Sequence, residues 1–340
     1  MTASSFHTDK KQLSRIIKIL FTLSFLVFIF YKTGLFRASK REQIFTILHG
    51  VNLEFLFISI LILMLMNISS VVKWRMLLAA RNIKVKFREI FQIYIMGKFF
   101  NLIFPATIGG DAARIIYLDR QVGKRYPLLA SVIIERATGL ITLIPLALVV
   151  VPFNTGLFYE TWPINYSVLI FSGIVMIAFL TVGETSLSFN QSFIYNIINR
   201  FPKISEKFGE IKNSIIEYKN DNKAIRWAFI NTVIFQILYT LNIWFIAHAF
   251  INNFTLADCL VAAPIIMVIS NLPISLGGIG VLEFSFIFTL SFFNITPLVA
   301  LSIALIVRMQ VIIDAVSGGF LYSSLRKDRT LLPKGRKLLS

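Results

Sequence analysis

The sequence has very few of the side chains from which soluble enzymes build metal centres and disulfides. It contains one cysteine, Cys259, and three histidines, which stand far apart at His7, His49 and His248. A single cysteine excludes an internal disulfide and a cysteine-based metal cluster. We therefore expect neither a metal site nor a cofactor.

Motifs for nucleotide binding and catalysis are also missing. The sequence has no Gly-x4-Gly-Lys-Ser/Thr phosphate loop, so we do not expect it to hydrolyse nucleotide. It has no Ser/His/Asp set and no Asp-rich metal motif. The longest polar stretch, residues 184–225, is shorter than an ordinary catalytic domain. These absences predict a protein that is not an enzyme.

Acidic residues are scarce, with 17 Asp and Glu against 34 Lys and Arg, which gives a formal net charge of +17. A basic surplus can indicate nucleic-acid binding. Here, however, the basic residues lie in short loops between apolar runs, which is the positive-inside pattern of membrane proteins. We therefore expect the basic surface to face anionic lipid headgroups, and we expect no nucleic-acid partner.

Apolar residues are abundant. They make up 56% of the chain, with 33 phenylalanines, and the mean hydropathy is +0.75. A run of about 20 apolar residues can cross a bilayer as a helix. The sequence therefore predicts an all-α, polytopic integral membrane bundle. Its spans are expected near residues 16–36, 44–72, 128–152, 166–183, 226–250 and 297–325.

Charge in the loops predicts the topology. The basic segments 73–88 (beginning at Lys73), 114–125 and 200–226 and the tail are placed inside, whereas loops 153–165 and 251–257 have no Lys or Arg and are placed outside. We expect a multi-pass protein of the inner (plasma) membrane with both termini cytoplasmic. The first outer loop, which holds Lys32 and Arg37, fits this rule poorly.

Two matching breaks interrupt the apolar sequence. One runs from Asn101 to Asp111 and the other from Asn271 to Gly280, and each contains Pro, three residues and Gly-Gly. Such residues are costly in lipid unless the freed backbone groups find partners. Interrupted segments at corresponding places in two halves of a transporter indicate its binding site.

The flanking charges give the two breaks opposite orientations. Segment 90–110 has cytoplasmic flanks, whereas segment 259–294 follows an outer loop, so we expect two inverted repeats, each with a re-entrant hairpin. Chance similarity between Leu/Ile-rich helices is the alternative. The chain is then one membrane domain, 1–340. It is divided into a first half (1–183), an amphipathic cytoplasmic linker (184–225), a second half (226–325) and a basic cytoplasmic tail (326–340).

Charged residues inside apolar spans are functional candidates by default. Arg136 and Arg308 follow the prolines that begin their spans by roughly 13 and 16 Å of helix, which places both near the midplane. Arginine recognises phosphate through a planar fork, and the glycines let backbone approach a ligand. The alternative is that the arginines neutralise Glu135, Glu283 or Asp314 and fix helix packing.

The motifs together resemble the transmembrane, flippase-like domain of lysylphosphatidylglycerol synthases, the UPF0104 family. The resemblance covers roughly residues 12–325 and implies a membrane protein that moves or handles lipids. We expect the chain to lack the soluble aminoacyltransferase domain of those synthases. Most residues of the resembling motifs are also candidate substrate-binding residues: Asn101, Pro105, Gly109, Gly110, Asp111, Arg114, Glu135, Arg136, Pro273, Ser275, Gly277, Gly278 and Glu283. Gly139, Leu140 and Gly280 belong to the motifs only, and Arg308 is a candidate that lies outside the motifs.

The leading hypothesis is a flippase-like transporter of a phosphate-containing lipid, either an anionic phospholipid or a lipid-linked sugar phosphate. A second hypothesis is a membrane-embedded headgroup or glycosyl transferase that uses Glu135 or Asp111 as a base. A third is a non-transporting partner of a lipid-synthesising enzyme.

Overall fold

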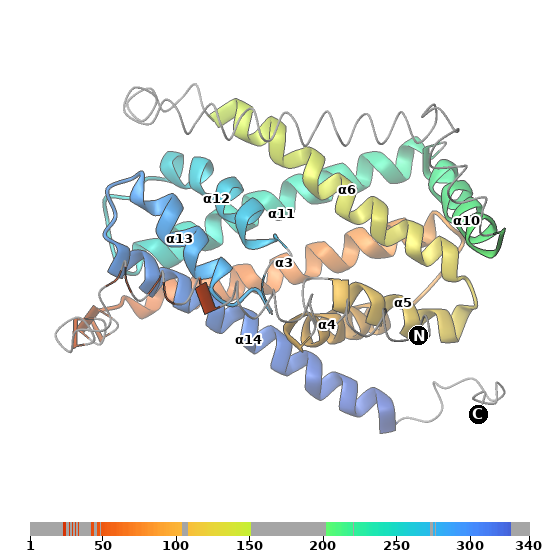
Figure 1. Cartoon of the computed structure of the whole chain (residues 1–340), viewed down its shortest axis with the longest axis horizontal. Helices are drawn as coiled ribbons and strands as arrows, with labels where there is room; N and C mark the ends of the chain where they lie inside the picture. The colour runs from red at the N-terminus through yellow and green to blue at the C-terminus, as the bar shows by residue number, and fades with distance from the viewer. Residues whose placement is uncertain are drawn as a thin grey trace, which may run out of the picture. The chain divides into compact units, whose positions relative to one another are not determined.

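The computed structural model describes residues 51–103, 108–150, 202–219, 221–272 and 277–327, together with Ser275 and part of the stretch 23–50. Over these residues the chain is helical and contains no strand. Much of the expected span 16–36, all of the span 166–183, Pro105, Pro273 and most of the tail lie outside them. The helices are α3 (Leu53–Ala79), α4 (Phe87–Ile103), α5 (Ile108–Val122), α6 (Arg125–Val150), α10 (Pro202–Lys219), α11 (Asn222–His248), α12 (Leu256–Ser270), α13 (Val281–Ser291) and α14 (Pro297–Lys327) (Figure 1).

Among the residues that the structure describes, three helices are long and apolar enough to cross a membrane: α3, α11 and Pro297–Ser324 within α14. At 1.5 Å per residue each is about 40 Å long, which exceeds a hydrocarbon core of about 30 Å. They correspond to the spans predicted at 44–72, 226–250 and 297–325. The predicted helical membrane protein is confirmed at this level.

The prediction for α3 was wrong at both ends. The helix begins at Leu53 and continues to Ala79, so Lys73 lies inside it and not in a loop. Trp74, Leu77 and Leu78 are fully buried, which shows that the apolar face of the helix continues past the lysine. The first basic residue was therefore a poor marker of the helix end.

The chain forms two compact units. The first unit comprises residues 1–63, 95–112 and 240–320. In it α12 and α13 pack side by side (Figure 1). Thr255 and Asp258 form a capping box at the start of α12, and α13 starts after Gly280, whose φ is 82°. With 15 and 11 residues these helices are about 22 and 16 Å long, too short to cross a bilayer.

The second unit comprises residues 64–94, 113–239 and 321–340. Here α10 packs against α6, and its Tyr218 is buried among Leu77, Ala130 and Ala228. The Tyr218 hydroxyl donates to the Leu77 carbonyl at 2.7 Å, and the guanidinium of Arg81 lies 4.0 Å from the centre of the Tyr218 ring. Burial raises the pKa of Tyr218 above its ordinary value. Of the amphipathic segment expected at 184–225, the described part, α10, is thus packed against the helices of this unit.

Candidate functional site

In the first unit Arg308 connects α14 to the second break. Its Nε and Nη2 donate to the two carboxylate oxygens of Glu283 at 2.8 and 3.1 Å. Its Nη1 and Nη2 also donate to the carbonyls of Gly277 (3.1 Å) and Gly278 (2.7 Å). Glu283 in turn accepts the Gly280 N–H at 2.8 Å. One side chain therefore bonds two backbone carbonyls of the second break, and the Gly278 carbonyl also accepts the Leu282 N–H at 3.2 Å.

The backbone conformation of the second break favours glycine at two positions. Gly277 and Gly278 have φ of 57° and 69°, in the left-handed region that favours glycine. A Cβ on Gly277 would lie 2.8 Å from the Leu102 carbonyl oxygen, just before the first break. Within the first unit, the segments that hold the two breaks are therefore in contact.

The first break also requires glycine for a close approach. A Cβ on Gly110 would lie 2.2 Å from the carbonyl oxygen of Gly97, so α4 and α5 could not pack as they do with any larger residue there. The Gly110 N–H donates to Oδ1 of Asn101 at 2.7 Å, and this bond satisfies a donor of the first turn of α5. Asn101 of α4 and Gly110 of α5 thus together stabilise the start of α5.

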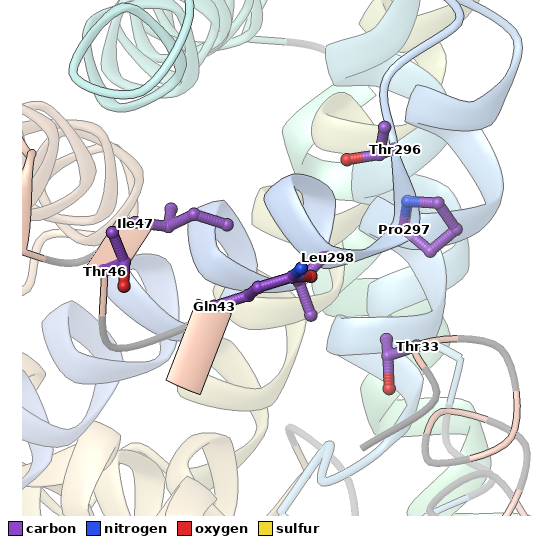
Figure 2. A pocket seen from close by; sticks show the side chains of 7 residues that line it. All are labelled: Thr33, Gln43, Thr46, Ile47, Thr296, Pro297 and Leu298. Carbon is purple, nitrogen blue, oxygen red and sulfur yellow. The ribbon is translucent and has the colours of Figure 1, made fainter. Parts of the chain in front are cut away.

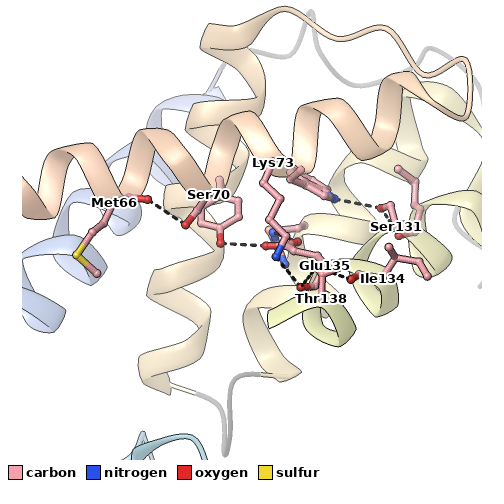
Figure 3. Close-up of polar contacts among 11 residues, drawn as sticks. Met66, Ser70, Lys73, Ser131, Ile134, Glu135 and Thr138 are labelled. Atoms are coloured by element: carbon pink, nitrogen blue, oxygen red, sulfur yellow. Dashed lines mark hydrogen bonds and ion pairs between the residues drawn. The ribbon is translucent and has the colours of Figure 1, made fainter. Parts of the chain in front are cut away.

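The second unit holds a different buried cluster, centred on Glu135 of α6 (Figure 3). Arg114 of α5 donates to its Oε2 at 3.1 Å, and the Tyr94 hydroxyl donates to its Oε1 at 3.1 Å. Lys73 of α3 donates to the Glu135 backbone carbonyl at 2.9 Å. The guanidinium of Arg114 also lies 4.7 Å from the centre of the Trp74 ring and 4.6 Å from that of Tyr94. Four helices therefore converge on one carboxylate and its arginine.

Each unit thus contains a buried Arg–Glu ion pair, Arg308–Glu283 in the first and Arg114–Glu135 in the second. The first unit also contains an ion pair between Lys98 and Asp314. Removing one partner of such a pair costs about 3–5 kcal/mol, because the other charge stays buried and uncompensated. Ionisable groups among apolar helices are expensive and mark functional sites by default.

The two arginines singled out from the sequence have different surroundings, each within its own unit. Arg308 is bonded to Glu283 as described, whereas Arg136 is exposed on α6. Neighbouring helix positions point about 100° apart, and on α6 it is Glu135 that points inward. Of the expected acidic partners of the arginines, Glu283 bonds Arg308, but Glu135 bonds Arg114 and Asp314 bonds Lys98.

The remaining predicted residues lie close to the breaks. Gly109 and Asp111 are partly exposed in the first turn of α5. Ser275 is buried, and its hydroxyl has no hydrogen-bond partner in the described part of the chain. Pro105 and Pro273 are outside the described residues.

Three residues of the second cluster were missed from the sequence: Lys73, Trp74 and Tyr94. Lys73 was assigned to a loop, and the two aromatic residues were indistinguishable from ordinary core residues. A signal was present for Lys73, since Trp74, Leu77 and Leu78 continue an apolar helical pattern beyond it.

A pocket of about 520 Å³ lies elsewhere in the first unit (Figure 2). Its lining carries hydroxyl, amide and apolar groups but no charge, so its chemistry differs from that of the two ion-paired clusters. The lining residues are Thr33, Gln43, Thr46, Ile47, Thr296, Pro297 and Leu298. Within the described ranges, no group of three or more His, Cys, Asp or Glu side chains could hold a metal ion.

Comparison with known proteins agrees with the architecture. The chain is 24% identical over 316 residues to a UPF0104 membrane protein of Methanocaldococcus jannaschii, an alignment that covers 88% of this chain and 90% of the relative. No solved structure matches the chain significantly. Residues 15–317 match the family described as lysylphosphatidylglycerol synthase TM region. The resemblance drawn from the sequence motifs is confirmed, and the chain belongs to this family of membrane proteins.

Proposed function

We propose that this protein moves a phosphate-containing lipid, either an anionic phospholipid or a lipid-linked sugar phosphate, across the inner (plasma) membrane. The buried Arg–Glu ion pairs, one in each unit, carry the proposal. Buried charge is costly among apolar helices, and a pure packing role could be met by apolar residues of similar volume. Membership of a lipid-related membrane family also supports this proposal.

The paired arginines have the chemistry to exchange partners with a lipid headgroup. An arginine fork has the geometry to bind the oxygens of either a carboxylate or a phosphate through two parallel hydrogen bonds. A headgroup phosphate would take the place of the Glu283 carboxylate on Arg308, and the released carboxylate would keep its bond from the Gly280 N–H. The acyl tails would remain in the lipid. Arg136, exposed on α6, would meet the headgroup at the protein surface.

The finer architecture is proposed as two inverted repeats with a re-entrant hairpin in each half. Helices on either side of each break support it: α4 and α5 flank the first break, and α12 and α13 flank the second. The short α12 and α13 pack against each other, as the two arms of a hairpin would. Contact between Gly277 and Leu102 supports a site at which both breaks meet. We further propose cytoplasmic termini and a non-enzymatic role.

Translocation in proteoliposomes tests the proposal. Full-length protein is reconstituted with a trace of headgroup-labelled fluorescent phosphatidylglycerol, and dithionite quenches the label in the outer leaflet only. We expect quenching to exceed the half found in protein-free vesicles, and we expect Arg308→Ala and Arg136→Ala each to slow it. Lys86→Ala removes an exposed charge of the second unit and serves as the control.

Wild-type rates in both arginine variants would contradict the phosphate-binding assignment. Mass spectrometry of lipids recovered from the same vesicles detects a new covalent product, which would instead indicate a transferase. No quenching beyond one half, together with co-purification of a lipid synthase, would favour a non-transporting partner.

A further inference from the structure

Lys73 is a buried cation whose ammonium makes no hydrogen bond or ion pair with a carboxylate in the described part of the chain; the nearby Glu135 carboxylate is shared with Arg114. Its residue is 7% exposed, inside α3, and its side chain points toward Glu135 and Thr138 (Figure 3). We infer that Lys73 binds the phosphate of the transported headgroup in the second unit. This assignment rests on the proposed function and names the residue that receives the phosphate there.

The hydrogen bonds of Lys73 leave donors available. An ammonium group has three N–H donors. One goes to the backbone carbonyl of Glu135 at 2.9 Å, and within the described residues no second acceptor takes the other two. The Glu135 carboxylate is itself bonded to Arg114 and Tyr94, and it makes no hydrogen bond or ion pair with Lys73.

A neutral carbonyl does not compensate a buried charge. Buried ammonium groups in folded proteins are paired with an anion or lose their proton, because their desolvation costs several kcal/mol. Phosphate matches the vacant donors, since its tetrahedral oxygens accept from an ammonium point charge and an arginine fork together. Arg114 and Lys73 both bond Glu135: the guanidinium of Arg114 bonds its carboxylate, and Lys73 bonds its backbone carbonyl. The Arg114 guanidinium also lies against the rings of Trp74 and Tyr94.

The same chemistry would accept a headgroup phosphate diester or inorganic phosphate, so the experiment contains both. Full-length protein in neutral detergent is titrated by isothermal calorimetry with dihexanoyl phosphatidylglycerol and, separately, with inorganic phosphate. Dihexanoyl glycerol, which has no phosphate, measures binding through the acyl chains alone.

Two substitutions separate charge from structure. Lys73→Gln keeps a donor for the Glu135 carbonyl but removes the charge, whereas Lys73→Arg keeps the charge. Loss of a charge-assisted hydrogen bond predicts about 10- to 100-fold weaker binding of dihexanoyl phosphatidylglycerol by Lys73→Gln. We expect Lys73→Arg to bind within about threefold of wild type. Lys84→Gln makes the same change at an exposed position of the same unit and should bind as wild type does.

Equal binding by Lys73→Gln and wild type would overturn the inference, as would wild-type protein that binds neither phosphate probe. Binding of inorganic phosphate without the lipid would overturn the headgroup assignment. If Lys73→Gln does not elute as a monodisperse protein, Lys73→Met, which keeps the stem length, takes its place. Binding that depends on Lys73 in a protein that moves no lipid would refute the proposed function alone. Translocation with Lys73-independent binding would refute this inference alone.

Discussion

The ion pair between Arg308 and Glu283 allows a quantitative prediction about the second break. The perturbations are Arg308→Met, Glu283→Gln and the double variant. Arg308→Met removes all four hydrogen bonds of the guanidinium and leaves the Glu283 carboxylate, 8% exposed, with the Gly280 N–H as its remaining described partner. An uncompensated buried carboxylate costs about 3–5 kcal/mol of unfolding free energy.

Glu283→Gln removes the charge but keeps the volume and an acceptor. Arg308 then retains the carbonyls of Gly277 and Gly278 as partners. The double variant has no buried charge at this position. Its loss of unfolding free energy should therefore be smaller than the sum of the losses of the two single variants. For a contacting charge pair we expect a coupling energy of about 1.5–3 kcal/mol.

Denaturant unfolding in mixed micelles, followed by tryptophan fluorescence, gives the four free energies of the double-mutant cycle. Arg120→Met, at an exposed position of α5, controls for loss of a cationic side chain and should change stability by less than about 0.5 kcal/mol. Additive losses within about 0.5 kcal/mol would refute the reasoning, because they would mean that the two side chains do not interact.

Other predictions concern backbone approach and the docking of α10. Gly277→Ala should destabilise by about 1–3 kcal/mol in the same titration, since a Cβ there combines positive φ with a 2.8 Å contact to the Leu102 carbonyl. Gly139→Ala, in α6 with open space around it, should be neutral or slightly stabilising; equal losses at the two glycines would contradict this account. Tyr218→Phe should cost about 0.5–1.5 kcal/mol through the lost bond to Leu77, and an unchanged midpoint would show that the bond contributes nothing. Because burial raises the pKa of Tyr218 above its ordinary value near 10, its contribution is complete below about pH 10 and is lost as pH rises through the folded-state pKa. A pH titration of stability should show a smaller loss above about pH 10 in Tyr218→Phe than in wild type.

The helical membrane class could be predicted because it depends on local sequence. Hydropathy over about 20 residues identified α11 and α14 closely, since a long apolar run has few other stable conformations. The Gly-Gly pairs were identified for a sound reason, as positive φ and close backbone approach both require glycine.

The partners of the buried charges could not be predicted from the sequence. Glu135 contacts Arg114 and Lys73, which are 21 and 62 positions away in the chain. Those contacts depend on how α3, α5 and α6 rotate about their axes, and packing decides that rotation. For the same reason the sequence could not show which of the adjacent residues Glu135 and Arg136 faces the interior. In the structure only Glu135 is buried.

Translocation of labelled phosphatidylglycerol by wild type and by Arg308→Ala tests the central claim most directly. The account predicts that dithionite quenches clearly more than half of the label in wild-type vesicles. It also predicts that Arg308→Ala, reconstituted in equal amount, quenches more slowly. Quenching of only half of the label with wild-type protein, or equal rates for both proteins, would contradict it.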